Sequence, residues 1–169
     1  RITMRMNLMI SFPLLLLACV EDIEKLPETE DPSGNIEPAV DEINFGELQL
    51  GSLVTETIEI ENTGDAELNI TSVSTVPPFF SNGIAIELAV GDKTSISIQF
   101  IPTSYTPSVG SLVIVSDDPD QSQLNIPLIG ATITDEDGDG YDTLDAGGDD
   151  CDDDDLDTYP GAPDEWYDG

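Results

Sequence analysis

The chain has 169 residues, of which 36 are acidic, four are basic and none is histidine, so its formal net charge is −32. This length suits one domain with flanking segments. Four basic residues cannot form a surface that holds a phosphate backbone, which excludes nucleic-acid binding. The lack of histidine removes the usual general base, the histidine-containing triads and every imidazole metal site. We therefore expect a protein that is not an enzyme.

The N-terminal segment has the layout of an export signal. Arg1 and Arg5 precede an apolar run that ends at Cys19, and acidic residues follow almost at once. The run is shorter than the roughly 20 apolar residues of a bilayer span, so we expect residues 1–18 to be removed. Residues 16–19 (LLAC) resemble the lipobox of bacterial lipoproteins. The resemblance implies that Cys19 is lipidated and anchors the chain to the outer membrane of a cell envelope, on its periplasmic face or at the cell surface.

Cys19 has one alternative fate, a disulfide with Cys151, the other cysteine of the chain. Lipidation accounts better for a cysteine that directly follows an apolar export run. Residues 19–38 are acidic and contain Pro27, Pro32 and Pro38, so we expect them to form a flexible tether and not to fold.

Residues 39–133 have the pattern of an all-β domain. Apolar and polar residues alternate, as in Ile96, Ile98 and Phe100, and turn residues separate the runs. The pattern predicts about seven short antiparallel strands, no helix longer than a turn, and an immunoglobulin-like β-sandwich. Residues 112–115 (LVIV) are apolar on both faces, as in a central strand.

Particular side chains are expected to build and delimit this domain. The core should contain the aliphatic faces of the strands together with Phe45, Phe79, Phe80 and Phe100. Gly64 suits a turn position with a positive φ. Pro102 and Pro119 should end strands, because proline cannot donate a hydrogen bond to a neighbouring strand. The acidic pair before Pro119 is expected to form a turn between strands.

Several motifs of this region resemble the choice-of-anchor D module, a relative of the ASH and HYDIN-type immunoglobulin-like domains. They occur in the family's order and cover nearly all of residues 40–132, the clearest being residues 43–46 (INFG), 60–70 (IENTGDAELNI), 98–103 (IQFIPT), 116–119 (SDDP) and 127–130 (PLIG). The resemblance implies an immunoglobulin-like fold and a role as a spacer or protein-interaction platform. It implies no catalytic chemistry.

Residues 134–169 form an acidic segment with the spacing of a calcium loop. Asp135, Asp137 and Asp139 occupy positions 1, 3 and 5 of a DxDxDG pattern. Gly140 follows where such a loop turns sharply, and Tyr141 can offer its backbone carbonyl at position 7. Oxygen donors without histidine or a CxxC pair favour Ca²⁺ over Mg²⁺, which resists dehydration.

The loop is not an EF-hand, because Ala146 stands where the bidentate glutamate belongs and no helices flank it. Its spacing, with further acids after the glycine, resembles a thrombospondin type-three repeat. A second acidic cluster at residues 149–157 supplies more candidates, chosen by position. The predicted metal ligands are Asp135, Asp137, Asp139, Tyr141, Asp142, Asp145, Asp150, Asp152 and Asp154.

The whole acidic stretch, with residues 150–153 (DCDD) and 160–165 (PGAPDE), resembles the metal-binding repeat of myxobacterial-type secreted proteins. In that family a cysteine that could pair with Cys151 usually stands where this chain has Tyr167. The family also continues past the final Asp-Gly, which implies that the chain extends beyond Gly169. The alternatives are a disordered acidic tail that improves solubility, or a site for copper or another metal.

These features together predict a non-enzymatic, lipid-anchored envelope protein. Its immunoglobulin-like domain would act as a spacer that presents a calcium-binding module for adhesion or surface structure, with protein or surface-glycan partners. The alternative is the N-terminal anchoring and linker segment of a larger secreted protein whose active part lies beyond residue 169.

Overall fold

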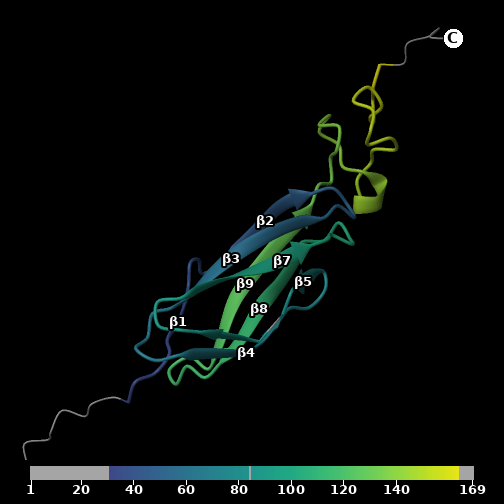
Figure 1. Cartoon of the computed structure of the whole chain (residues 1–169). Coiled ribbons are helices and arrows are strands. Elements are labelled where there is room, and N and C mark those ends of the chain that lie inside the picture. Colours follow the sequence, from purple (N-terminus) through teal and green to yellow (C-terminus); the bar gives the residue numbers. More distant parts are fainter. Residues whose placement is uncertain (1–30, 84, 164–169) are drawn as a thin grey trace, which may run out of the picture. The chain divides into compact units, whose positions relative to one another are not determined.

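The computed structural model describes residues 31–83 and 85–163 (Figure 1). The export signal, Cys19, most of the predicted tether and Tyr167 lie outside these residues. Apart from one short 3-10 helix, η1 (Leu144–Ala146), the regular structure of the described part is all-β, as the alternating pattern predicted. Its strands are β1 (Ile36–Pro38), β2 (Ile43–Leu48), β3 (Val54–Asn62), β4 (Leu68–Ser74), β5 (Phe79–Ser81), β6 (Ile86–Leu88), β7 (Lys93–Phe100), β8 (Ser108–Ser116) and β9 (Gln123–Thr132).

Two sheets face each other, with strand orders β1-β3-β7-β5 and β2-β9-β8-β4-β6. The number of strands exceeds the prediction of about seven, because β1, β5 and β6 have only three residues each, too few to show a period. The prediction of purely antiparallel pairing is also wrong, since β2 runs parallel to β9. Residues 112–115 lie in β8, which has β9 on one side and β4 on the other, so the expected central position is confirmed.

The core lies between the sheets and is centred on three aromatic rings. The Phe79 and Phe100 rings stack with centroids 4.9 Å apart, and Phe45 lies 5.6 Å and 5.4 Å from them. Phe80 was predicted to join this core, but its side chain is 43% exposed. The reason is the two-residue period of a strand: Phe79 points inward, so its neighbour must point outward.

The domain begins earlier than predicted. Ile36, assigned to the tether from its charged surroundings, is only 2% exposed and starts β1. β1 pairs with β3, and the backbone N–H of Ile36 donates to Oδ2 of Asp118 at 2.9 Å. Burial of one large apolar side chain and these hydrogen bonds outweigh the unfavourable local composition. The tether therefore ends before Ile36 and not at Pro38.

Gly64 is required by close packing and not by a left-handed backbone. It is absent from the glycines with positive φ, contrary to the prediction. A Cβ atom at this position would lie 2.3 Å from the carbonyl oxygen of Ser33 and 2.6 Å from the nitrogen of Asn35. The turn after β3 can thus accept the incoming chain only if residue 64 lacks a side chain.

The chain enters and leaves the sandwich at opposite ends of β9 (Figure 1). The turn that precedes β9 contains Asp118, which holds the start of β1. At the other end, the N–H of Ile133 donates to the carbonyl of Leu48 at 2.9 Å, and the acidic segment follows. In the described part of the chain no helix is long and apolar enough to cross a membrane.

Candidate metal centre

The first acidic loop is built directly on the end of β9. The N–H of Thr143 donates to the carbonyl of Thr134 at 2.8 Å and closes the loop at its base. Within the loop, Oδ1 of Asp135 accepts from the N–H of Gly138 at 2.8 Å, and Oδ2 accepts from the N–H of Gly140 at 3.1 Å. Gly140 has a φ of +94°, which fits the sharp turn predicted at this position.

Asp137 and Asp139 each accept one hydrogen bond, from the backbone N–H two residues further on, whereas Asp135 uses both of its oxygens. Oδ1 of Asp137 accepts from the N–H of Asp139 at 3.0 Å, and Oδ1 of Asp139 accepts from the N–H of Tyr141 at 2.8 Å. In both residues the second carboxylate oxygen is not used by these turns. The local sequence therefore orients two carboxylates with one oxygen each left for another partner.

A second loop brings Asp150 against the first. Thr143 and Asp150 form a parallel β-bridge, and the N–H of Leu144 donates to the carbonyl of Asp150 at 3.0 Å. The N–H of Asp150 donates in turn to the carbonyl of Asp142 at 3.1 Å. Asp150 is 1% exposed, and its Oδ1 accepts from the N–H of Asp152. A charged side chain is thus fully buried at the junction of the two loops.

Asp137, Asp139 and Asp150 together form a candidate cation site, here called the buried triad. One carboxylate oxygen from each of them lies within 4.8 Å of the others. The Oδ2 atoms of all three are buried without a hydrogen-bond partner. Buried polar atoms nearly always have partners, and buried carboxylates are normally paired with a cation. The donors are all oxygen, which fits a hard cation such as Ca²⁺.

The electrostatics of the triad are unfavourable without a cation. Partial burial raises the pKa of Asp137 above its ordinary value, and the nearby charges of Asp139, Asp150 and Asp135 raise it further. The hydrogen bond from the N–H of Asp139 acts in the opposite direction but is outweighed. A bound divalent cation would reverse the sign of these interactions.

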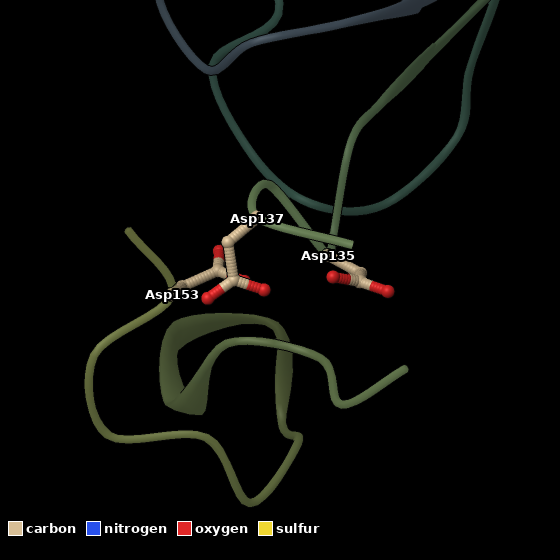
Figure 2. A group of neighbouring side chains, drawn as sticks. All are labelled: Asp135, Asp137 and Asp153. Carbon is tan, nitrogen blue, oxygen red and sulfur yellow. The ribbon is translucent and has the colours of Figure 1, made fainter. Parts of the chain in front are cut away.

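A second group shares Asp137 with the buried triad. Asp135, Asp137 and Asp153 also place one carboxylate oxygen each within 4.8 Å of the others. Figure 2 shows that Asp153 reaches this group from a different segment of the acidic region than the two loop aspartates. Oδ1 of Asp153 accepts from the N–H of Glu136 at 3.0 Å, which fixes its position. Asp153 was not among the predicted ligands, because nothing distinguishes it within the acidic run of residues 152–155.

The two groups contain four of the predicted ligands, namely Asp135, Asp137, Asp139 and Asp150. Neither group contains the other four predicted carboxylates, Asp142, Asp145, Asp152 and Asp154. The ring of Tyr141 stacks on that of Tyr159, with centroids 5.5 Å apart and planes at 8°. A role for the Tyr141 carbonyl as a ligand stays a prediction. Cys151 is exposed.

Residues 34–130 match the sequence pattern of the HYDIN/CFA65/VesB-like, Ig-like domain, over more than half of the chain. The chain belongs to this family. The family assignment agrees with a domain that includes β1, since Ile36 lies inside the match. It also agrees with the predicted relation to HYDIN-type domains. The match ends before the acidic loops, so it says nothing of a metal.

Solved structures share the fold of this family member. The ASH/PapD-like domain 7 of human CEP192 is 19% identical with a TM-score of 0.52, and the similarity covers 64% of this chain and 92% of that domain. A protein of unknown function from Porphyromonas gingivalis W83 is 23% identical with a TM-score of 0.52, covering 58% of this chain and 46% of that one. These structural similarities confirm the predicted immunoglobulin-like sandwich. A comparison with curated protein sequences finds no match.

Proposed function

We propose that this chain is a non-enzymatic, lipid-anchored cell-envelope protein whose immunoglobulin-like domain is a spacer for a calcium-binding module. The module would serve adhesion or surface structure. The observation that carries the calcium part of the proposal is the buried triad, three carboxylates whose buried Oδ2 atoms have no hydrogen-bond partner.

The path of the chain through the sandwich supports the spacer role. The described chain reaches β1 beside the turn before β9, and the acidic loops follow the other end of β9. β9 has ten residues, which corresponds to roughly 33 Å at the rise of a β-strand. Because the incoming chain and the acidic loops join the domain at opposite ends of β9, the domain adds its own length to the distance between a tether and the loops. Family membership is consistent with this role, because an immunoglobulin-like fold by itself implies no catalytic chemistry.

Calcium would act by joining the two acidic loops. Asp137 and Asp139 come from the first loop and Asp150 from the second, so one ion held by all three fixes the loops to each other. Binding to the folded module but not to the unfolded chain stabilises the module by RT ln(1 + [Ca²⁺]/Kd). At a free calcium concentration ten times Kd, this amounts to about 1.4 kcal/mol.

Isothermal titration calorimetry on the mature chain, residues 20–169 with Cys151→Ser, tests the calcium proposal. We expect saturable Ca²⁺ binding, a much weaker response to Mg²⁺, and at least tenfold weaker Ca²⁺ binding in Asp150→Asn. The matched control is Asp154→Asn, which removes one charge at an exposed aspartate outside both groups. Equal weakening by both substitutions would show a diffuse charge effect and refute the site.

Lipidation is tested separately in a bacterial host that processes lipoproteins. Incorporation of a labelled fatty acid should occur in the full chain and should be lost in Cys19→Ser. A chain that is exported but unlabelled would remove the anchor from the proposal and leave the calcium site unaffected.

A further inference from the structure

The two connections of the sandwich to the rest of the chain set the direction in which tension acts on it. The incoming chain reaches β1 beside Asp118, in the turn before β9, and the acidic loops follow the other end of β9 (Figure 1). Tension between these connections therefore acts along β9 and pulls its C-terminal end away from the start of β1. The topology of the domain fixes this direction.

Strand β2 runs parallel to β9, the last strand, and lies beside it at the edge of the five-stranded sheet. The pairs run from Ile43 opposite Leu128 to Leu48 near the end of β9. The N–H of Ile133 extends this ladder by donating to the carbonyl of Leu48 at 2.9 Å. Tension reaches β2 at its N-terminal end and β9 at its C-terminal end. In a parallel pair these are opposite ends, so the strands are pulled past each other and their hydrogen bonds bear the tension together.

The buried side chains of β2 oppose this sliding. Ile43 and Phe45 are each 7% exposed, and the Phe45 ring packs against the rings of Phe79 and Phe100. A shift of β2 by one residue would turn Ile43 and Phe45 to the outer face of the sheet. A shift by two residues, roughly 6.6 Å, would draw the Phe45 ring away from its two aromatic neighbours. Because no small displacement relieves the tension, the β2–β9 pair must break as a whole.

Strand β1 precedes β2 in the path of the tension and is held more weakly. It has three backbone pairs with β3, one buried side chain, and the hydrogen bond from the N–H of Ile36 to Asp118. We therefore expect β1 to be released before β2 bears the full tension. Its release frees residues 31–42, which lengthens the chain by up to roughly 40 Å at about 3.3 Å per residue.

We propose that the sandwich is a load-bearing domain, in which the β2–β9 pair resists tension along the chain and β1 is released first. The use of this property rests on the proposed spacer role, whereas the property itself requires neither lipid nor calcium. It goes beyond that role, because a spacer needs only length and a load-bearing domain must stay folded under force. Forced unfolding is governed by the rate of unfolding and not by the equilibrium stability, so the direction of the tension matters.

Single-molecule force spectroscopy in chelator, on residues 20–169 with Cys151→Ser and Ser122→Cys, tests this proposal. One handle is attached to the N-terminal end, and the other to the C-terminal end or to the thiol introduced by Ser122→Cys. Ser122 is exposed and lies directly before β9. Pulling there separates β2 and β9 from the same end, so their hydrogen bonds break one after another. We expect an unfolding force at least about twofold higher between the two ends of the chain than between the N-terminal end and position 122.

The same chain is pulled in both directions, so the equilibrium stability is identical and the direction alone differs. Two variants provide a second comparison. Phe45→Leu and Phe79→Leu each remove one ring from the aromatic core, but Phe45 lies on β2 and Phe79 lies on β5, outside the path of the tension. At a matched loss of folding free energy, Phe45→Leu should lower the end-to-end unfolding force more than Phe79→Leu does.

Equal unfolding forces in the two directions would overturn the proposal. So would an equal lowering of the end-to-end force by the two phenylalanine variants. Unfolding of the sandwich before a separate lengthening of up to roughly 40 Å would overturn the order assigned to β1 and β2. Because the measurement is made in chelator on a chain without Cys19, its result is independent of the calcium and lipid parts of the proposed function.

Discussion

Asp118 is a buried carboxylate, 1% exposed, that holds three backbone N–H groups. Oδ2 accepts from Ile36 at 2.9 Å, and Oδ1 accepts from Asp120 at 2.8 Å and from Gln121 at 3.0 Å. One side chain therefore shapes the turn between β8 and β9 and fixes the start of β1. The acidic pair before Pro119 was predicted to form a turn between strands. Asp118 forms this turn and also binds the start of β1.

Asp118→Asn should lower the free energy of unfolding by about 1–3 kcal/mol. The amide keeps one acceptor oxygen but turns an NH₂ group toward a backbone N–H, leaving a buried donor without a partner. Urea denaturation at pH 7 measures the change. The control is Asp120→Asn, an exposed neighbour whose substitution should cost less than about 0.5 kcal/mol. Equal stability of Asp118→Asn and wild type would contradict the assigned hydrogen bonds.

The stabilisation by Asp118 should depend on pH. Burial raises the pKa of Asp118, but the N–H groups of Ile36, Gln121 and Asp120 together outweigh burial, so the pKa lies below its ordinary value. A carboxyl group with a lowered folded pKa stabilises above its unfolded pKa of about 3.9 and loses this contribution as the pH falls through the folded pKa. The stability difference between wild type and Asp118→Asn should therefore shrink below about pH 4. A constant difference from pH 7 to pH 3 would refute the linkage.

At the scale of single residues, local spacing predicted the turn-forming aspartates of the first acidic loop. Asp150 was chosen by its position in the second cluster, not from its contacts with the first loop. Two other contacts between distant residues were missed. Asp135, Asp137 and Asp139 were found because the DxDxDG spacing encodes its own turns. Asp118 meets Ile36 across 82 positions, and Asp153 meets Glu136 across 17. Such pairs follow from tertiary folding, for which no local pattern exists.

Strand β1 is the element in which sequence and structure disagree most. Three residues cannot display a period, and the surrounding acids and prolines are typical of a disordered segment. The longer strands β3, β7 and β9 were predicted because each has enough residues to show alternation between a buried and an exposed face. β8 was predicted from a different pattern, the run of residues 112–115 that is apolar on both faces. Strand length thus decided which elements the sequence revealed.

A chain that begins at residue 39 should be less stable than one that begins at residue 31, by about 2 kcal/mol or more. The shorter chain loses the burial of Ile36 and leaves Asp118 without one of its three donors. Thermal denaturation of the two chains measures the difference. Glu37→Ala, at the exposed centre of β1, should change stability by less than about 0.5 kcal/mol. If the two lengths melted together, β1 would be dispensable and the predicted tether boundary at Pro38 would be adequate.

At the scale of the whole molecule, the two folded parts depend on different interactions. The buried apolar side chains run from Ile36 to Leu128 and all belong to the sandwich. In residues 134–163 the buried side chain is Asp150, whereas Leu144 and Leu156 are more than half exposed. The sandwich is thus stabilised by apolar burial, and the acidic loops have hydrogen bonds and, in our proposal, a cation.

This division predicts that calcium protects the loops without protecting the sandwich. In chelator, amide hydrogens of residues 136–155 should exchange at least tenfold faster than in 1 mM Ca²⁺, because the repelling carboxylates of the triad open the loops. Amides of β7 and β8 should exchange at the same slow rate in both conditions, since the core does not contact the ion. Hydrogen exchange followed by mass spectrometry measures both regions in one experiment, with Mg²⁺ and Asp150→Asn as controls. Slow exchange of the loops in chelator would mean that their hydrogen bonds suffice without an ion. Faster exchange of the sandwich in chelator would mean that the two parts open as one cooperative unit.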